Sequence, residues 1–323
     1  MALTAVAADA RRFSSALQLP AFCEQTRMLV IAPHPDDETI ANGVLIQRVR
    51  AAGGAVKIVL LTAGENNPWP QRWLERRLWI GAADRLRWGQ RRHIELGQAL
   101  RQLDVPPVAL QTLEWQDMRV TDEVLGSLTR AVEELAGAIR AFCPSIVAMP
   151  SIDDRHPDHG SAYVLTRLAL AQLSDAPVQL TYLIHGRDGQ ERLVEVTGTS
   201  EQLANKLLAL EAHRSQMALS GSRMRRLAGR AERYAQVLPV PPTPRNVLPW
   251  QPPRWLRPML RLTVVDRSAA QTWPWSQAPL WRDDEGMYHL ELPDAGATGP
   301  RFVRLACALP SLWIFDRWGW CEV

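Results

Sequence analysis

MLVIAPHPDDE, at residues 28–38, is an apolar run that leads directly into prolines, a histidine and acidic residues. An unbroken apolar run that contains β-branched residues is typical of a parallel strand covered on both faces. The prolines end the strand, and a helical pattern follows to about residue 52. We therefore expect His34, Asp36 and Asp37 just beyond the carboxyl end of a strand, where open α/β sheets bind their ligands.

An imidazole and two carboxylates this close together suggest a metal site. His34 and Asp37 offer nitrogen and oxygen ligands, which leaves Asp36 free to accept a proton. The alternative is an acidic helix N-cap that stands beside a histidine with no ligand role.

A second cluster, PSIDDRHPDH at residues 150–159, has the same arrangement. It follows an apolar run at 145–149 and precedes a helical pattern from about Gly160. Two strand ends, each followed by a His/Asp cluster, predict one site assembled across neighbouring strands. His159 would complete a set of two histidines and one carboxylate with open coordination positions.

The two clusters together resemble the PIG-L/LmbE-type zinc-dependent de-N-acetylases. The resemblance lies in PHPDDE at 33–38, in HPDH at 156–159, and in KLLALEAHRSQ at 206–216, which is similar to a late segment of that family. It covers roughly residues 25–217. Family members often carry glycines after the first motif, whereas this chain has the single Gly43 there, which affects helix packing and leaves the ligand set intact.

The resemblance implies a role for each residue of the two clusters. Three side chains would bind zinc, namely His34, Asp37 and His159. Asp36 would act as the general base. His156 would stabilise the oxyanion or protonate the departing amine, with Asp158 orienting its ring.

Residues 71–103 have a helical pattern that is unusually rich in Trp and Arg. One interpretation is a lid that stacks a sugar on tryptophan and binds phosphate with arginine. The alternative is an amphipathic helix with a solvated arginine face and buried tryptophans. Arg92 and Glu95, three residues apart, are expected to pair on one face, as in a similar helix of the family. We assign substrate contacts to Trp69, Arg92 and Asp117.

Strand and helix patterns alternate along the first part of the chain. Strand patterns occur at 56–62, 109–113, 145–149 and 178–185, and a long helical pattern occurs at 123–142. This alternation predicts an α/β fold with a Rossmann-like, mostly parallel sheet and helices on both faces. We divide the chain into a deacetylase-like domain (1–240), a Pro-rich linker (241–258) and a small β-rich C-terminal appendage with many Trp residues (259–323), whose role the sequence does not indicate.

Composition excludes several classes of protein. The 323 residues are 46% hydrophobic and 22% charged, with a net charge of +3, which does not favour nucleic-acid binding. Cys23, Cys143, Cys307 and Cys321 form no Cys-x-x-Cys pair, and we expect mostly buried thiols in a reducing compartment. No secretory pattern and no long apolar run occur, so we expect a cytoplasmic protein without a transmembrane segment; peripheral contact with the inner face of the membrane stays compatible with this.

The predicted function is therefore hydrolysis of an N-acetyl group on an N-acetylhexosamine, either GlcNAc or GalNAc. The carrier would be a glycoconjugate such as a lipopolysaccharide core, a surface polysaccharide or a glycolipid. The cofactor would be Zn²⁺, with Fe²⁺ or another divalent metal as the alternative. Rival functions are a glycan-binding protein without catalysis, an amidase for another acylated amine, and a non-haem iron oxygenase. The sequence does not define the oligomeric state.

Overall fold

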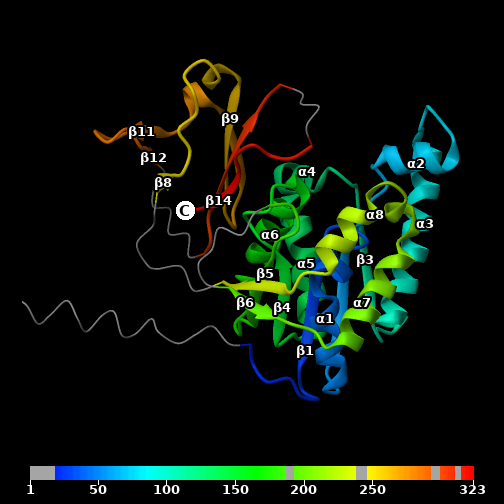
Figure 1. Cartoon of the computed structure of the whole chain (residues 1–323). Coiled ribbons are helices and arrows are strands. Elements are labelled where there is room, and N and C mark those ends of the chain that lie inside the picture. Colours follow the sequence, from blue (N-terminus) through cyan, green and yellow to red (C-terminus); the bar gives the residue numbers. More distant parts are fainter. Residues whose placement is uncertain (1–18, 187–192, 238–245, 292–298, 310–313) are drawn as a thin grey trace, which may run out of the picture.

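The computed structural model describes residues 19–186, 193–237, 246–291, 299–309 and 314–323 (Figure 1). Residues 1–18 of the predicted deacetylase-like domain and residues 241–245 of the predicted linker lie outside this part of the chain. Its largest element is a seven-stranded sheet with the order β3-β2-β1-β4-β5-β7-β6. The strands are β1 (Arg27–Ala32), β2 (Ala55–Thr62), β3 (Leu110–Trp115), β4 (Ile146–Pro150), β5 (Val178–Tyr182), β6 (Val194–Val196) and β7 (Glu232–Gln236).

The strand that the opening stretch predicts lies near the middle of this sheet. β1 pairs in parallel with β2 on one side and with β4 on the other. The pairs β2–β3 and β4–β5 are also parallel, whereas β7 is antiparallel to both β5 and β6. The carboxyl ends of β1 and β4 therefore lie side by side, as the two His/Asp clusters require.

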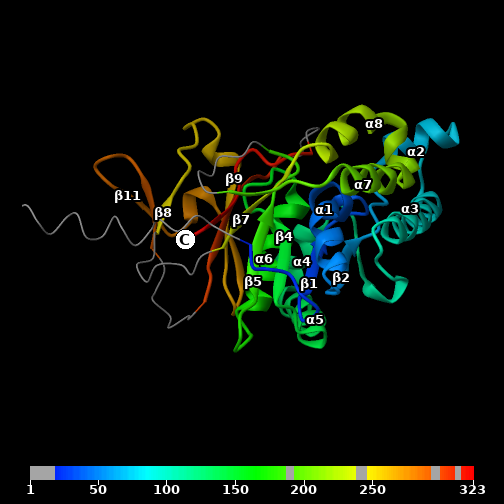
Figure 2. The same cartoon turned by 60° about the horizontal axis from the view of Figure 1, so that its bottom comes forward.

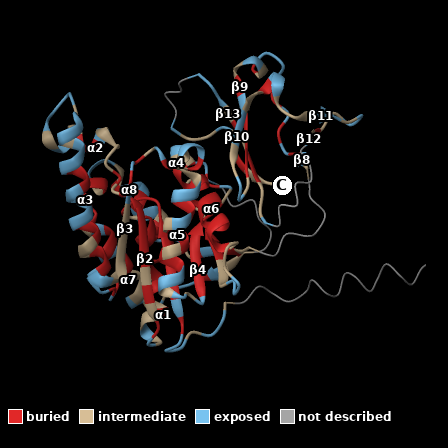
Figure 3. Cartoon of the chain, turned by 180° about the vertical axis from the view of Figure 1, so that it is seen from behind, coloured by how far each residue is buried: buried red, intermediate tan, exposed pale blue. Residues whose placement is uncertain are grey.

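Helices cover both faces of the sheet, which confirms the predicted fold class. One hydrophobic core joins Met28 and Val30 of β1 to helices on one face, and the other joins Leu29 and Ile31 to helices on the opposite face. The first face carries α1 (Asp37–Ala51), α3 (Ala82–Gln102), α7 (Ser200–Ala212) and α8 (Arg214–Ala228), which Figure 2 shows grouped together. The second carries α4 (Val120–Gly126), α5 (Leu128–Phe142) and α6 (Pro157–Leu170). Figure 3 shows the sheet strands largely buried between these helices.

Several boundaries differ from the sequence predictions. The helix expected at 123–142 is two helices, because the segment breaks at Ser127 directly after Gly126, a poor helix former. The strand expected at 178–185 ends at Tyr182, so His185 lies in the loop beyond it. Arg92 does not pair with Glu95; the carboxylate of Glu95 instead accepts a hydrogen bond from Arg91 (3.1 Å).

The C-terminal region is β-rich, as predicted. Its strands are β8 (Val247–Leu248), β9 (Leu260–Val265), β10 (Ala270–Pro274), β11 (Leu280–Arg282), β12 (Tyr288–Leu290), β13 (Phe302–Cys307) and β14 (Gly319–Glu322). They form an antiparallel sheet with the order β10-β9-β13-β14 and a smaller one with the order β11-β12-β8. β8 falls inside the predicted linker, because residues 247–248 pair with β12 instead of forming an extended connection.

This region packs directly against the helix that carries the second cluster. Trp320 of β14 lies over Gly160, where a Cβ atom would come within 2.8 Å of its ring, so this contact requires glycine. The guanidinium of Arg167 in α6 donates to both carboxylate oxygens of Glu322 (3.2 and 3.0 Å). Trp320 and Phe302 also belong to the core beneath α5 and α6. The appendage is therefore continuous with the α/β domain.

The prediction that the cysteine thiols are mostly buried is wrong. Cys23, Cys143 and Cys307 are exposed, and Cys321 is half-buried. All four are free thiols at the periphery of the packed layers. Within the described residues, no helix combines the length and the apolar character needed to span a bilayer.

Candidate metal and active site

The two predicted clusters meet at the carboxyl ends of β1 and β4. The ring centroids of His34 and His156 are 4.7 Å apart, those of His34 and His159 are 5.4 Å apart, and those of His156 and His159 are 5.1 Å apart. His185 joins them, with its centroid 5.0 Å from that of His159. Residues separated by more than 120 positions in the sequence thus form one buried cluster.

Asp37 links the two histidines that we predicted as fellow ligands. Its Oδ2 atom accepts the backbone N–H of His34 (2.8 Å) and lies 3.4 Å from Nδ1 of that ring. The same oxygen lies 3.3 Å from Nε2 of His159. The predicted ligands His34, Asp37 and His159 are therefore connected through a single carboxylate oxygen.

Three overlapping groups of side chains place their ligand atoms within 4.8 Å of one another. These groups are His34 with His156 and His159, Asp37 with His159 and His185, and His34 with Asp117 and Asp158. The predicted ligands are thus distributed over more than one group, and the structure adds His156, His185, Asp117 and Asp158 as neighbours. Nε2 of His159 is buried without a hydrogen-bond partner in the described residues, which fits a donor atom reserved for a cation.

Asp36 adopts a conformation that is rare for a residue other than glycine, with φ at 121°. Its backbone N–H donates to the carboxylate of Glu38 (3.0 Å). Arg92 donates to the backbone carbonyl of Pro35 (2.6 Å) and to Oδ2 of Asp36 (3.2 Å). These contacts hold the strained turn, and they keep the Asp36 carboxylate next to Asp37 and the cluster.

Arg92 is almost completely buried in this arrangement. Its guanidinium also donates to the carbonyl of Gly64 (2.7 Å). The guanidinium of Arg92 thus already donates to three acceptors within the chain. This arrangement suits a residue that positions Asp36 better than one that contacts substrate, which was our prediction. Arg92 still lines the cavity described below.

Asp154, which the sequence did not distinguish from its neighbours, organises the second cluster. Its Oδ2 atom lies 3.1 Å from Nδ1 of His159 and accepts the backbone N–H groups of Ile184 and His185. Its Oδ1 atom accepts the backbone N–H of His156 (2.9 Å). A carboxylate on the far nitrogen of a candidate ligand fixes the ring and its tautomer. PSIDDRHPDH contains this residue, but only the fold shows which of its two adjacent aspartates faces inward.

Asp158 contacts different partners from those predicted. Its carboxylate accepts the backbone N–H groups of Met118 (2.8 Å) and Val120 (3.1 Å) and lies 3.2 Å from Nε2 of His34. Only its backbone N–H reaches His156, donating to Nδ1 (3.3 Å). The prediction that this carboxylate orients the ring of His156 is therefore wrong. The carboxylate instead contacts the ring of His34, because α6 directs it towards the loop after β1.

Asp117, predicted as a substrate contact, also lies beside the ring of His34. Its Oδ1 atom is 3.2 Å from Nε2 of His34, and its Oδ2 atom accepts the backbone N–H of Asn66 (2.8 Å). Asp117 thus joins the loops after β2 and β3 to the cluster.

The charges of the cluster shift the pKa values of its members strongly. Burial opposes a charged imidazole at His159, but the carboxylates of Asp154 and Asp37 raise its pKa to about 10. Burial favours the neutral form of Asp117, but the hydrogen bond and charge of His34 lower its pKa to about 2. A buried site with this excess of carboxylate charge favours a cation among its rings.

His156 and Asp36 are shifted in ways that suit catalysis. Burial, together with the charges of His34 and His159, holds the pKa of His156 well below its usual value, so its ring is neutral near pH 7. Because Nδ1 of His156 accepts a hydrogen bond, the proton lies on Nε2. Burial raises the pKa of Asp36 to about 6, against the opposing charge of Arg92.

The cluster opens into a cavity of about 390 Å³. Trp69 lines it and is 67% exposed. Asn67 and the buried Gln216 also line it, and the amide of Asn67 donates to Oε1 of Gln216 (3.3 Å). Trp69 therefore lies in the wall of the cavity, and its contact with substrate stays a prediction.

The C-terminal region supplies part of the cavity wall, a role that the sequence analysis did not predict. Ile314 and Phe315 line the cavity, and the ring of Phe315 lies 5.5 Å from that of His185 and 6.2 Å from that of His156. The backbone N–H of Asp316 donates to the carbonyl of Arg155 (2.8 Å), which fixes this segment beside the second cluster.

The late Lys…His segment lies under the first loop. His213 lies 3.3 Å from the carboxylate of Glu38 and so contacts the first loop from below. Lys206 donates to Glu232 of β7 (2.7 Å), and that carboxylate also accepts the N–H groups of Val44 and Leu45 inside α1. This buried ion pair ties the end of the sheet to the helix that begins at Asp37.

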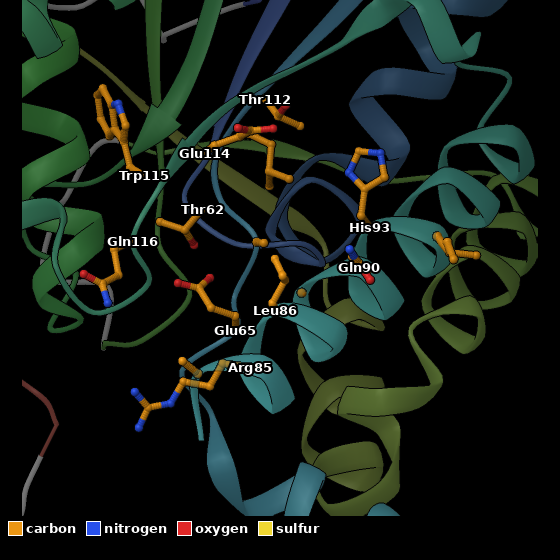
Figure 4. A pocket seen from close by; sticks show the side chains of 15 residues that line it. Thr62, Glu65, Arg85, Leu86, Gln90, His93, Thr112, Glu114, Trp115 and Gln116 are labelled. Atoms are coloured by element: carbon orange, nitrogen blue, oxygen red, sulfur yellow. The ribbon is translucent and has the colours of Figure 1, made fainter. Parts of the chain in front are cut away.

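A larger cavity of about 890 Å³ lies between α3 and β3 (Figure 4). Leu86, His93 and Glu114 are among its lining residues. It shares Glu65 with the site, since Glu65 accepts the backbone N–H of Asp117 (2.9 Å). Among the described residues, none of the three ligand groups lies in it, so we place the chemistry in the smaller cavity.

A mostly parallel sheet with a buried His/Asp cluster at the carboxyl ends of two adjacent strands defines an α/β protein with a candidate metal site. The family model of PIG-L, described as GlcNAc-PI de-N-acetylase, matches residues 29–170, and this part of the chain belongs to that family. The matched stretch begins in β1 and ends in α6, so it contains both clusters.

Curated relatives match a stretch of similar length. A protein from Mycobacterium leprae named 1D-myo-inositol 2-acetamido-2-deoxy-alpha-D-glucopyranoside deacetylase is 34% identical over 161 residues, which cover 46% of this chain and 51% of that protein. The chain thus spans about half the length of the curated relatives it matches.

Solved structures share the fold. A deacetylase triple mutant from the teicoplanin biosynthetic pathway has a TM-score of 0.55 at 19% identity and covers 68% of this chain and 100% of that one. N,N'-diacetylchitobiose deacetylase from Pyrococcus horikoshii has a TM-score of 0.51 at 20% identity and covers 66% and 84%. About a third of this chain lies beyond each of these matches.

Proposed function

We propose that this chain is a divalent-metal-dependent hydrolase that removes the acetyl group from an N-acetylglucosaminide. One observation carries the proposal: Oδ2 of Asp37 lies between Nδ1 of His34 (3.4 Å) and Nε2 of His159 (3.3 Å), with Asp36 adjacent and a cavity above them. His34, Asp37 and His159 would hold the metal, and His156, His185, Asp117 and Asp158 lie close enough to support it.

The proposed chemistry is addition of water to an acetamide. A bound divalent cation supplies a Lewis acid for the amide carbonyl and the attacking water. Asp36 accepts a proton from that water, and its raised pKa suits a base that must also release the proton. The water oxygen bonds to the carbonyl carbon, the C–N bond breaks, and the amine nitrogen takes up the proton from Asp36. The other water proton remains on the new carboxyl group and passes to the amine, giving acetate and an ammonium group.

His156 fits an oxyanion donor in this reaction. Its ring is neutral, and its Nε2–H is the free donor because Nδ1 accepts the N–H of Asp158. Of the two roles we predicted for His156, stabilisation of the negatively charged oxygen has the better support. Protonation of the amine is left to Asp36 in its protonated state.

The names of the relatives and the lining of the cavity support our proposal for the substrate class. The curated relatives are named for a glucosaminide of myo-inositol, and Trp69 offers an aromatic face for a sugar ring. We therefore propose an N-acetylglucosamine unit on a polar or lipid carrier. The relatives lend no support to a lipopolysaccharide substrate, and we do not carry that assignment further.

Acetate release tests this function. The full chain, loaded with Zn²⁺, should release acetate from N-acetylglucosaminides, including the inositol glycoside, and should release none from acetylated peptides. The matched variant Asp37→Ala should be inactive on every substrate. Acetate from the peptides alone would overturn the proposal, and glycan binding without acetate release would favour a binding protein on this fold.

The metal is tested separately. Protein purified without oxygen should contain zinc in a ratio of about one per chain, and chelation should abolish acetate release until zinc is restored. Activity that requires iron and consumes oxygen would instead identify an oxygenase.

A further inference from the structure

Helix α2 (Pro68–Glu75) and the loop that joins it to α3 carry large apolar side chains that face solvent. We call residues 69–86 the α2 prominence. Trp73 is 67% exposed, Leu78 84% and Trp79 88%, and Leu86 in the first turns of α3 is also exposed. In Figures 1 and 3 the prominence projects from one end of the molecule, away from the sheet.

The loop is held in this extended shape by polar contacts. Arg76 ends α2 in a left-handed conformation with φ at 54°. Arg77 donates to the carboxylate of Asp84 (2.6 Å), and the amide of Gln71 donates to the carbonyl of Asp84 (2.7 Å). The tryptophans are therefore presented to solvent by a structured turn, whereas Trp88, which follows in α3, is completely buried.

The charges on the prominence are not balanced. Its two acidic residues, Glu75 and Asp84, are engaged by arginines, since Arg87 donates to both. Arg76 and Arg85 are exposed and have no ion-pair partner in the described part of the chain. The surface around the tryptophans is therefore positive.

The prominence also lies beside the entrance to the candidate site. Trp69 and Pro68, in the first turn of α2, line the 390 Å³ cavity. α8 packs beside α2 and carries exposed Leu219 and Arg226. A surface that engaged Trp73 and Trp79 would thus lie close to the opening of the cavity.

We propose that the α2 prominence docks on an anionic phospholipid surface. Trp and Leu side chains suit the boundary between headgroups and acyl chains, and unpaired arginines attract acidic headgroups. The positive charge distinguishes this surface from a contact between two copies of the chain, since two such patches would repel each other. The proposal extends the proposed function, because a docked cavity would face a sugar carried on a lipid.

Vesicle sedimentation of the full chain tests the docking. Binding to phosphatidylcholine vesicles that contain about a third phosphatidylglycerol should exceed binding to phosphatidylcholine alone by about tenfold and should weaken with salt. The triple variant Trp73→Ser, Leu78→Ser, Trp79→Ser should lose at least about tenfold in partitioning. A second variant, Arg76→Gln with Arg85→Gln, should abolish the preference for anionic vesicles.

Matched controls lie elsewhere on the surface. Val108 and Trp255 are 90% and 70% exposed, and Val108→Ser with Trp255→Ser should leave vesicle binding unchanged. The triple variant should keep its acetate release from a water-soluble N-acetylglucosaminide, which separates failure of docking from failure of the proposed function. Vesicle binding that is absent, or equal in the wild type and the triple variant, would overturn the proposal. A dimer that the triple variant loses, without any vesicle binding, would instead assign the surface to a second copy.

Discussion

The α/β domain and the C-terminal β region both line the cavity, but they bring different chemistry to it. The loops after β1 and β4 contribute histidines and carboxylates that are buried and hydrogen-bonded to one another. The C-terminal region contributes Ile314 and Phe315, which are apolar. The family match at 29–170 covers the first set only. If the proposed function holds, we expect variants of the first set to affect the chemistry and variants of Ile314 or Phe315 to affect the binding of substrate.

The largest effect is expected from removing the carboxylate that connects the candidate ligands. Asp37→Ala should lose the metal and lower the rate of acetate release by at least about a thousandfold, since two histidines alone hold a divalent ion poorly. Metal content by mass spectrometry and acetate release measure the two losses. Asp104→Ala, at an exposed carboxylate beyond the end of α3, is the matched control and should retain both.

A substitution at the adjacent carboxylate, Asp36, should separate metal binding from catalysis. Asp36→Asn should lower turnover by about a hundred- to ten-thousandfold, the usual contribution of a general base, while the bound metal stays. The same metal and acetate measurements apply. Loss of the metal in this variant would make Asp36 a ligand and would reverse its role with that of Asp37.

A smaller effect is expected at the aromatic side chain from the C-terminal region. Phe315→Ala should reduce kcat/KM about three- to tenfold, mainly through KM, because it removes an apolar contact from the cavity and leaves the metal cluster intact. Trp281→Ala, at an exposed tryptophan of the same region, should change neither constant. A fall in kcat alone would place Phe315 in the chemistry and would weaken the contrast between the two regions.

The smallest effect concerns the junction of the two regions. Glu322→Gln removes the charge that pairs with Arg167, and it should lower the free energy of unfolding by about 1 kcal/mol, as expected for a half-buried ion pair. Chemical denaturation measures this, with Glu285→Gln at an exposed carboxylate as control. A junction variant that unfolds in two separate steps would show that the two regions are independently stable.

The elements that depend on the pattern of apolar and polar residues could be predicted from the sequence. An apolar run such as 28–32 indicates a buried strand, and the position of His34 and His159 after two such strands was enough to predict that they meet. The sequence could not identify Asp154 or Phe315, because their importance depends on which way a loop turns and on the packing of a region without a recognisable pattern.

Side-chain environments were predicted less well than positions. Arg92 was expected to contact substrate, yet its guanidinium holds the strained turn at Asp36. Cys23 and Cys143 were expected in the core, whereas they stand at loop and helix ends on the surface. In each case the prediction was based on the type of residue. The burial of a side chain, however, depends on neighbours that come from distant parts of the chain.

Helix α1 depends on contacts with Glu232, a residue that is synthesised much later than the helix itself. Its carboxylate accepts the N–H groups of Val44 and Leu45, and Tyr234 donates to the carbonyl of Ala41 (2.8 Å). During synthesis on the ribosome, the helix that starts at Asp37 therefore cannot complete its native hydrogen bonds until β7 has emerged. The nascent chain therefore carries α1 without these contacts while almost two hundred further codons are translated.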